Sequence, residues 1–299
     1  MYNGKKIGIV IPAYNEEDLI DDTLNGMPSF ADTIYVTDDC SLDNTAEIVK
    51  TFALRDKRIK LIQHNKNQGV GGAIASGFKD AIIEGMDIVV VMAGDNQMDS
   101  QYLPILLEPI INNIADFTKG NRLKPGYWKG MSFFRLIGNF ILTFLNNLVS
   151  GYWHIKDPQN GYIAISTECL KKMDLDSLYK GYAFENDLMV KANVQHLRMK
   201  NVLIPALYGK EKSKIKYGKF IFKTSLFLIQ SFFWRIWKKL IRTFHPIGVL
   251  YIFGMLSLLG GLISGIILSF TSLWPIVLLG SSLILLAFIA DGLTGTLKK

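Results

Sequence analysis

The sequence contains few cysteines and histidines, which limits the kinds of site it can support. Of its 299 residues only Cys40 and Cys169 are cysteine, and they are far apart without the spacing of a metal site. A disulfide framework is therefore excluded, and a reducing, cytosolic location is indicated. The four histidines are scattered and form no metal-binding pattern, so we interpret them as ordinary surface or partly buried residues.

Charged side chains are missing from one long stretch and concentrated just before it. Residues 243–290 contain no Asp, Glu, Lys or Arg, whereas residues 210–242 contain ten Lys or Arg and a single acid, Glu211. The formal net charge of +7 therefore belongs mainly to this basic segment, and residues 1–209 are close to neutral. Because the basic residues alternate with Phe, Trp, Ile and Leu beside a hydrophobic stretch, they predict contact with an anionic membrane and no nucleic-acid partner.

Two uncharged segments, residues 246–270 and 272–290, are each about as long as a membrane-spanning helix must be. Turn-forming residues separate them, so they predict a transmembrane hairpin. The hairpin contains glycines that allow close helix approach, at positions 254, 260, 261 and 265. Paired hairpins of this kind would suit a homo-oligomer.

The basic residues around the hairpin predict its orientation. Lys and Arg crowd its entrance, Lys298 and Lys299 follow its exit, and the loop between the helices has none. The positive-inside rule then places both ends of this multi-pass protein, and its N-terminal domain, in the cytoplasm. Residues 1–10 lead directly into a short apolar run ending at Pro12, which predicts no signal peptide.

The chain before the basic segment alternates between two hydrophobic patterns. Short apolar, β-branched runs predict strands at residues 6–11, 33–37, 59–63, 87–92, 116–119, 161–166 and 202–204. Helical patterns fall between the first four, at residues 17–27, 45–54 and 71–84. This alternation predicts an α/β domain with a mostly parallel sheet over residues 1–210. A basic juxtamembrane segment at 211–242 and a transmembrane hairpin at 243–299 complete the predicted organisation.

Two further segments are amphipathic helices. In residues 133–149 the apolar positions form one stripe, with Asn, Thr and Ser on the opposite side. This stripe either packs on its own domain or docks at a membrane surface. Residues 218–241 combine Phe and Trp with Lys and Arg, and because a spanning segment follows directly, we expect a helix along the membrane surface.

Polar motifs follow the first three predicted strands, at the sheet edge where ligands of such folds bind. The run 11–17 (IPAYNEE) is on its own compatible with a strand exit and an acidic first helical turn. The run 38–43 (DDCSLD) supplies a helix cap and two adjacent acids, which can accept hydrogen bonds from a nucleobase or ribose. The run 65–73 (NKNQGVGGA) is a glycine-rich helix entry where backbone can approach a phosphate.

The fourth strand is followed by residues 92–99 (MAGDNQMD), which contain a candidate metal site. Asp95 and Gln97 are two apart at a strand end, so their oxygens can face the same side. Oxygen ligands suit a hard divalent cation, Mg²⁺ or Mn²⁺, completed by diphosphate oxygens and water. The alternative is a loop in which Asp and Asn only form turns.

In this order and spacing the four motifs resemble family 2 glycosyltransferases of the GT-A fold. The match is closest to the dolichol-phosphate mannosyltransferase-like and undecaprenyl-phosphate sugar transferase branch, and it covers residues 1–120 most strongly. The resemblance implies metal ligands at Asp95 and Gln97, with Ala93 in place of the first acid of that motif and Cys40 where Gly is usual. The residues assigned to the nucleotide pocket are Pro12, Tyr14, Glu16, Asp39, Gly71 and Asp95.

Later motifs extend the resemblance towards the acceptor. Residues 120–122 resemble the Gly-x-Arg element that faces the lipid phosphate in these enzymes, which implies Arg122 as a phosphate ligand, with Arg135 a second candidate. The runs DPQNGY and YAFEND fit motifs near the sugar and acceptor. The site carboxylates that they imply are Asp157, Glu185 and Asp187. The alternative is that these three carboxylates are ordinary surface or helix-capping side chains.

The resemblance implies inverting, metal-dependent transfer of a sugar from a nucleotide-sugar donor, a UDP- or GDP-sugar, to dolichyl or undecaprenyl phosphate. Asp95 and a divalent cation would stabilise charge on the leaving nucleotide. A polyprenyl phosphate acceptor is already anionic and requires no base. A hydroxyl acceptor requires one, and Asp187 is then the candidate, with Glu185 beside it.

Two alternatives stay open from the sequence. The first is a glycosyltransferase that acts on a hydroxyl, such as a glycolipid or polysaccharide synthase. Its processive forms carry a Gln-x-x-Arg-Trp signature, whereas here the nearest such residues, Trp234 and Arg235, stand in reverse order. The second is a non-catalytic membrane scaffold that binds a nucleotide sugar. Ala93 is compatible with a scaffold, although Asp39, Asp95 and Gln97 all remain.

Overall fold

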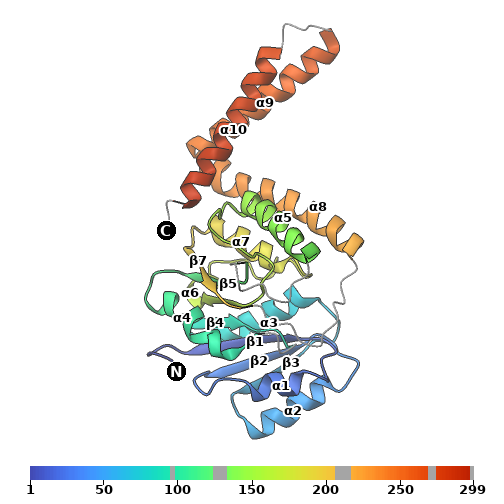
Figure 1. The fold of residues 1–299 in the computed structure, drawn as a ribbon, viewed down its shortest axis with the longest axis vertical. Helices are drawn as coiled ribbons and strands as arrows, with labels where there is room; N and C mark the ends of the chain where they lie inside the picture. Colours follow the sequence, from blue (N-terminus) through green and yellow to red (C-terminus); the bar gives the residue numbers. More distant parts are fainter. Residues whose placement is uncertain (95–97, 124–132, 206–216, 269–273, 297–299) are drawn as a thin grey trace.

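A seven-stranded sheet forms the centre of the N-terminal domain in the computed structural model, which describes residues 1–94, 98–123, 133–205, 217–268 and 274–296 (Figure 1). The strands are β1 Ile7–Ala13, β2 Thr33–Asp38, β3 Ile59–Gln63, β4 Ile88–Val91, β5 Phe117–Asn121, β6 Ile163–Ser166 and β7 Met199–Leu203. Their order is β3-β2-β1-β4-β6-β5-β7. All neighbours pair in parallel except β6, which is antiparallel to β4 and β5.

Helices cover both faces of this sheet, which explains why its strands are almost continuously apolar. One face carries α1 Ile20–Asn25, α2 Thr45–Arg55 and α4 Leu103–Ile111, the last preceded by a short 3-10 turn at Ser100–Tyr102. The other face carries α3 Val70–Ile83, α6 Thr167–Leu170 and α7 Phe184–Val194. Within β1, Val10 packs on the second layer, while Ile9 and Ile11 pack on the first.

The α/β fold class and the mostly parallel sheet are confirmed. All seven predicted strands are present, with ends that differ from the predicted ones by a few residues. Parallel strands place the carboxyl ends of β1, β2, β4 and β5 at one edge, where the motifs follow. The helices α4 and α7 have no counterpart among the predicted elements.

Two long apolar helices, α9 Pro246–Leu268 and α10 Trp274–Thr296, form a hairpin that projects away from the sheet (Figure 1). Each contains a segment long and apolar enough to cross a membrane, Pro246–Ser264 and Trp274–Thr294. The predicted close approach occurs at Gly254, where a methyl group would lie 3.1 Å from the carbonyl oxygen of Gly280. It also occurs at Gly261, whereas Gly260 faces open space. Gly265 stands in a part of α9 whose side chains are not described.

The helix α5, Phe133–Ser150, turns its polar side inward and its apolar side outward. Asn146 is fully buried, and its Oδ1 accepts a hydrogen bond of 2.8 Å from Nδ2 of Asn186 on α7. Phe144, on the opposite side, is 57% exposed. The alternative that the apolar stripe packs on its own domain is therefore wrong. The exposed apolar side chains of α5 are Ile137, Phe140, Ile141, Phe144 and Leu145.

The helix α8, Tyr217–Arg235, continues as a π-helical turn, Ile236–Ile241, so the helix expected at residues 218–241 is confirmed. It packs beside α5, and both lie at the base of the hairpin (Figure 1). Its outward side is also apolar. The exposed large side chains of this segment are Leu226, Ile229, Phe233, Trp234 and Trp237. With α5 they form an outward surface, called here the apolar faces of α5 and α8.

Candidate active site

The first two motifs meet at the carboxyl ends of β1 and β2. The backbone N–H of Asn15 donates to the Ser41 hydroxyl at 3.0 Å, and that of Glu16 donates to the Thr45 hydroxyl at 2.9 Å. In return, the N–H of Leu42 donates to Oδ1 of Asn15 at 2.9 Å. These reciprocal bonds join two motifs that are distant in sequence into one wall at the edge of the sheet.

Three other predicted residues also stand at this edge. Pro12 is the penultimate residue of β1, and Tyr14, just beyond it, is 41% exposed and so open to a ligand. Cys40 has a φ of +65°, a conformation that glycine adopts without strain. This explains why a glycine is usual at that position in the family that the motifs resemble.

Asp39 is buried, and its carboxylate organises the glycine-rich turn after β3. Oδ1 accepts the backbone N–H of Gln68 at 2.8 Å, and Oδ2 accepts that of Gly69 at 2.7 Å. Oδ1 also lies 2.7 Å from Nδ1 of His64, whose Nε2 is 2.9 Å from the Ser76 hydroxyl. The bonds of Asp39 within the chain thus fix the second and third motifs against each other at the edge of the sheet.

Gly71 stands where the glycine-rich turn approaches the segment before α7. Its backbone N–H donates to the carbonyl oxygen of Lys180 at 2.9 Å. A methyl group at Gly71 would overlap the carbonyl oxygen of Tyr179 and lie 2.9 Å from Cβ of Phe184. The glycine therefore permits backbone to approach backbone and joins the third motif to the motif that carries Glu185.

Gly71→Ala is expected to destabilise the protein by about 3 kcal/mol, since an added methyl group forces two backbone segments apart. Thermal or denaturant unfolding of the purified protein measures this. Gly138→Ala is the matched control, because no atom lies within 4 Å of the added carbon on α5. There alanine should stabilise the helix slightly. Equal stability of the two variants would contradict the close approach at Gly71.

The candidate metal ligands Asp95 and Gln97 lie outside the described residues, between β4 and the turn before α4. The described residues on either side are bonded to α1 and to each other. The Thr23 hydroxyl donates to the carbonyl oxygen of Gly94 at 3.0 Å, and the Ala93 N–H lies 3.2 Å from Sδ of Met98. The described part of the chain contains no cluster of three or more His, Cys, Asp or Glu that could hold a metal ion.

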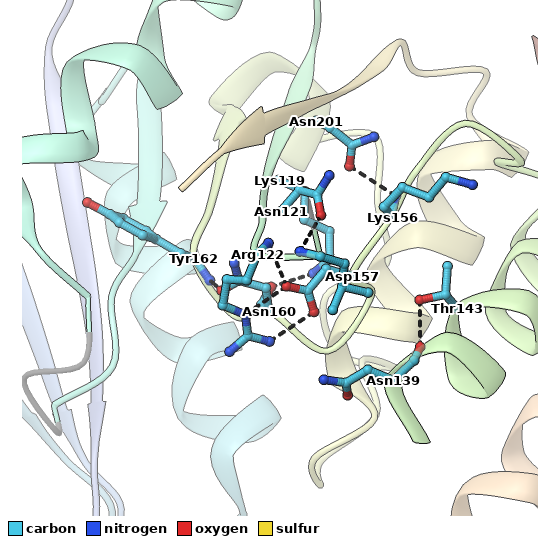
Figure 2. Close-up of polar contacts among 11 residues, drawn as sticks. Lys119, Asn121, Arg122, Asn139, Thr143, Lys156, Asp157, Asn160, Tyr162 and Asn201 are labelled. Carbon is cyan, nitrogen blue, oxygen red and sulfur yellow. Dashed lines mark hydrogen bonds and ion pairs between the residues drawn. The ribbon is translucent and has the colours of Figure 1, made fainter. Parts of the chain in front are cut away.

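Arg122, which is partly buried, and Asp157, which is fully buried, form an ion pair through two side-chain nitrogens just beyond β5 (Figure 2). Nε and Nη2 of Arg122 donate to the two carboxylate oxygens of Asp157 at 2.7 and 2.9 Å. The backbone N–H of Arg122 adds a third bond of 3.0 Å. The structure thus brings together two residues that the motifs assign to the acceptor and the sugar. Arg135 is the second arginine candidate, and its side chain lies outside the described residues.

Lys119 and Glu185 are two buried charges between β5 and α7. Nζ of Lys119 donates to the carbonyl oxygen of Asn160 at 2.5 Å. Oε2 of Glu185 is buried without a hydrogen-bond partner among the described residues. Burial raises the pKa of the Glu185 carboxyl to about 7, although the positive charge of Lys119 opposes the shift. Burial likewise lowers the pKa of the Lys119 ammonium to about 8, and the negative charge of Glu185 opposes that shift.

Asp187, the predicted base for a hydroxyl acceptor, is held inside the domain. Its Oδ2 accepts Nζ of Lys191 at 2.6 Å and the backbone N–H of Tyr179 at 2.8 Å. Both side chains of this ion pair are nearly inaccessible. Of the two carboxylates in this motif, Glu185 is the one with a buried oxygen that has no hydrogen-bond partner among the described residues.

Two residues near the site were missed by sequence reasoning. His64 was interpreted as an ordinary histidine, yet it contacts both Asp39 and Ser76. Lys119 was not considered, although a lysine inside a short strand that precedes a Gly-x-Arg element is an unusual residue for a buried sheet. That position in the strand was the available signal for Lys119, and no comparable signal marked His64.

The sheet order, its single antiparallel strand and the polar carboxyl edge define a glycosyltransferase domain of the GT-A type. The sequence profile of glycosyl transferase family 2 matches residues 8–173, from β1 to just beyond α6. This chain belongs to that family and is a glycosyltransferase. The resemblance seen in its motifs is therefore confirmed.

Relatives of known name share a substantial part of the chain. It is 32% identical over 218 residues to UDP-N-acetylglucosamine–dolichyl-phosphate N-acetylglucosaminyltransferase of Methanococcus voltae, covering 68% of this chain and 86% of that one. It is 29% identical to the dolichol-phosphate mannosyltransferase of Pyrococcus furiosus, and the match covers 73% of this chain and 61% of that one. It is also 29% identical to the undecaprenyl-phosphate mannosyltransferase of Micrococcus luteus, and the match covers 60% of this chain and 74% of that one.

Solved structures agree at the level of the fold. Glucosyl-3-phosphoglycerate synthase from Mycobacterium tuberculosis superposes with a TM-score of 0.58 at 18% identity, covering 78% of this chain and 79% of that one. The GT-A architecture expected from the motifs is thereby confirmed.

Proposed function

We propose that this glycosyltransferase moves a sugar from a UDP- or GDP-sugar to the phosphate of a membrane polyprenol, such as dolichyl or undecaprenyl phosphate. The product is a polyprenyl-phosphate monosaccharide with inverted anomeric configuration. The names of three relatives support a polyprenyl phosphate acceptor, because each describes a transfer to dolichyl or undecaprenyl phosphate. We further propose residues 1–210 as the catalytic domain, 211–242 as the juxtamembrane segment and 243–299 as the membrane hairpin.

The observation that carries this proposal is the outward orientation of the apolar faces of α5 and α8. A soluble domain buries the apolar side of an amphipathic helix, whereas α5 buries its asparagines and exposes Ile141, Phe140 and Phe144. Both helices lie at the base of α9 and α10, where a bilayer surface would meet the catalytic domain. An acceptor whose phosphate lies at that surface would reach the site without leaving the membrane. We propose that the catalytic domain lies on the cytoplasmic side.

For the donor, we propose a pocket at the carboxyl ends of β1, β2 and β4. The mycobacterial synthase of the same fold was solved with Mg²⁺ and UDP and also with Mn²⁺ and UDP-glucose. Carboxylate and amide oxygens of Asp95 and Gln97 suit such a cation. When bound, the cation supplies positive charge to the leaving diphosphate. The residues proposed to line the nucleotide are Pro12, Tyr14, Glu16, Asp39, Gly71 and Asp95.

For the acceptor, we propose that Arg122 binds the lipid phosphate, with Arg135 a second ligand. Asp157 holds the guanidinium of Arg122 through Nε and Nη2, which fixes its direction before the acceptor arrives. Attack occurs from the face of the sugar opposite the leaving nucleotide. The phosphate oxygen is already anionic, so this step requires no proton acceptor.

The experiment that tests the function supplies full-length protein, in phospholipid vesicles with Mg²⁺ or Mn²⁺, with polyprenyl phosphate and a panel of UDP- and GDP-sugars. We expect mass spectrometry to detect one lipid-phosphate-linked monosaccharide. Sugar transfer to a lipid or glycan hydroxyl, with none to phosphate, would replace the proposal by the hydroxyl-acceptor alternative. Donor binding without any transfer would support the scaffold.

Glu185→Gln separates the two acceptor classes through the pH profile of the rate. If Glu185 were a base, wild-type activity would fall tenfold per unit as pH drops below about 7, because the protonated carboxyl cannot accept a proton. If Glu185 is the base, replacing it by glutamine should lower the rate of sugar transfer by about 10²-fold or more. If the acceptor is a phosphate, we expect Glu185→Gln to lower the rate by less than about tenfold and to leave the shape of the pH–rate profile unchanged. Loss of an acid limb near pH 7 in the variant would contradict the phosphate acceptor.

Phe144→Glu tests the contact between α5 and the membrane. A charge on this exposed apolar face should lower transfer to polyprenyl phosphate in vesicles by about tenfold, because the side chain loses roughly 2 kcal/mol of favourable apolar transfer. The unfolding temperature should fall only slightly, since the side chain is 57% exposed and its ring meets that of Trp153 edge-on. Leu54→Glu is the control, because this exposed leucine lies on α2, away from the hairpin. Equal activities of the two variants would contradict membrane contact by α5.

A further inference from the structure

A fully buried arginine lies where the membrane hairpin meets the catalytic domain. Arg235, the last residue of α8, has no solvent exposure, and its partner Asp291 on α10 is 3% exposed. Nη1 and Nη2 of Arg235 donate to the two carboxylate oxygens of Asp291 at 3.1 and 2.7 Å. A charge pair withdrawn from water is costly unless its geometry is close to ideal, so this pair calls for an explanation beyond general stability.

The same guanidinium also binds the C-terminal end of α5. Nε donates to the carbonyl oxygen of Val149 at 2.6 Å, and Nη2 donates to that of Leu148 at 3.3 Å. These carbonyls lie in the last turn of the helix, where they have no partner within it and where a positive charge is favourable. A planar fork of N–H donors can make these four bonds together, which a lysine ammonium cannot.

The chain next to this pair is shaped to admit it. Gly151 has a φ of +75°, and a methyl group there would lie 2.8 Å from Nη1 of Arg235. Gly292, which follows Asp291, lies against the indole of Trp153, where a methyl group would be 3.0 Å from Nε1. The end of α10 thus meets the turn after α5 through Gly292, and it is joined to the end of α5 through Asp291 and Arg235.

From these contacts we infer that Arg235 and Asp291 are positioning residues that fix the membrane hairpin relative to α5, and thereby set the height of the active site above the bilayer. The inference rests on the proposed function, because it concerns delivery of a membrane-bound acceptor. An acceptor phosphate anchored in a bilayer lies at a fixed depth. A hairpin that pivots on the domain misplaces the site relative to that phosphate, and displacements of about 1 Å cost large factors in rate.

Asp291→Asn tests the inference by comparing two acceptors for the full-length protein in phosphatidylcholine vesicles. One is a long-chain polyprenyl phosphate in the bilayer, and the other is geranyl phosphate added from solution. We expect kcat/KM for the long-chain acceptor to fall about tenfold or more, and that for geranyl phosphate to stay within about twofold, since a soluble acceptor reaches the site at any orientation. Equal losses on both acceptors, or no loss on the long-chain one, would overturn the inference.

Asp176→Asn is the matched control, because it removes the same charge from an ion pair in which the acid is 85% exposed. Should the wild-type protein transfer sugar to neither acceptor, the proposed function fails, and hydrogen exchange then decides the inference. We expect Asp291→Asn to increase amide exchange at residues 148–153 and at the end of α10 while leaving β1–β4 unchanged. Unchanged exchange at residues 148–153 would overturn it.

Discussion

Asp95→Ala is expected to lower kcat for sugar transfer by about three orders of magnitude at saturating donor. Between residues 93 and 97 it is the sole carboxylate, because Ala93 stands where the family motif has an acid. Its loss would leave the amide of Gln97 as the remaining proposed ligand in this motif, and a neutral amide binds a hard cation more weakly than a carboxylate. Steady-state rates in vesicles, measured over a range of Mg²⁺ or Mn²⁺ concentrations, give the result.

The control for this variant is Asp99→Asn, four residues further along the chain. Oδ1 of Asp99 accepts the backbone N–H of Gln101 at 2.8 Å, so its role is to cap the short helix that precedes α4. The control should cost up to about 1 kcal/mol of stability and leave kcat unchanged. Sugar transfer by the Asp95→Ala protein at near wild-type rates would contradict the assignment of Asp95 as a metal ligand.

Asp39→Ala is expected to destabilise the protein by about 3 kcal/mol and to raise the KM for the donor at least about tenfold. The variant leaves the backbone N–H groups of Gln68 and Gly69, and the ring of His64, without the acceptor that they contact in the native protein. Buried donors without a partner are costly, and the glycine-rich turn would lose its position beside the proposed nucleotide pocket. Chemical denaturation and donor titrations measure the two effects separately.

Asp38→Asn is the matched control for Asp39, since it changes the adjacent acid. Oδ1 of Asp38 accepts one bond, from the Ser41 N–H, at a long 3.3 Å. The control should therefore cost less than about 1 kcal/mol. A larger rise in donor KM for Asp38→Asn than for Asp39→Ala would transfer the nucleotide contact to Asp38.

The strands and the order of the motifs were predictable from the sequence because they depend on local patterns. Apolar β-branched runs mark strands that are buried on both faces, and each of the first four runs is followed by its motif within a few residues. The helix α7 was not predictable in this way, since nearly all of its residues are buried, polar ones included, and it shows no apolar stripe. The apolar stripe of α5 was recognised from the sequence. Whether that stripe faces the domain or a membrane surface was not predictable, because the helical spacing is the same in both cases.

Side-chain roles at the site depend on contacts between distant segments, which sequence spacing does not contain. The motif assigned Asp39 to a nucleotide pocket. The bonds of Asp39 to Gln68 and Gly69 were not predictable from the motif, because they depend on β2 and β3 lying side by side. Glu185 and Asp187 look alike in sequence. Asp187 faces Lys191 one helical turn away on α7, whereas Glu185 faces the sheet beside Lys119.

The outward direction of the α5 stripe decides how the catalytic domain behaves without its hairpin. A chain cut after Arg242 would lose α9 and α10 but keep the apolar faces of α5 and α8, because the side of α5 that meets the domain is the polar one. Such a fragment would adhere to vesicles as a peripheral protein and self-associate in water. Polar substitutions on those two faces would be required to make it soluble, and they would leave the buried asparagines of α5 untouched.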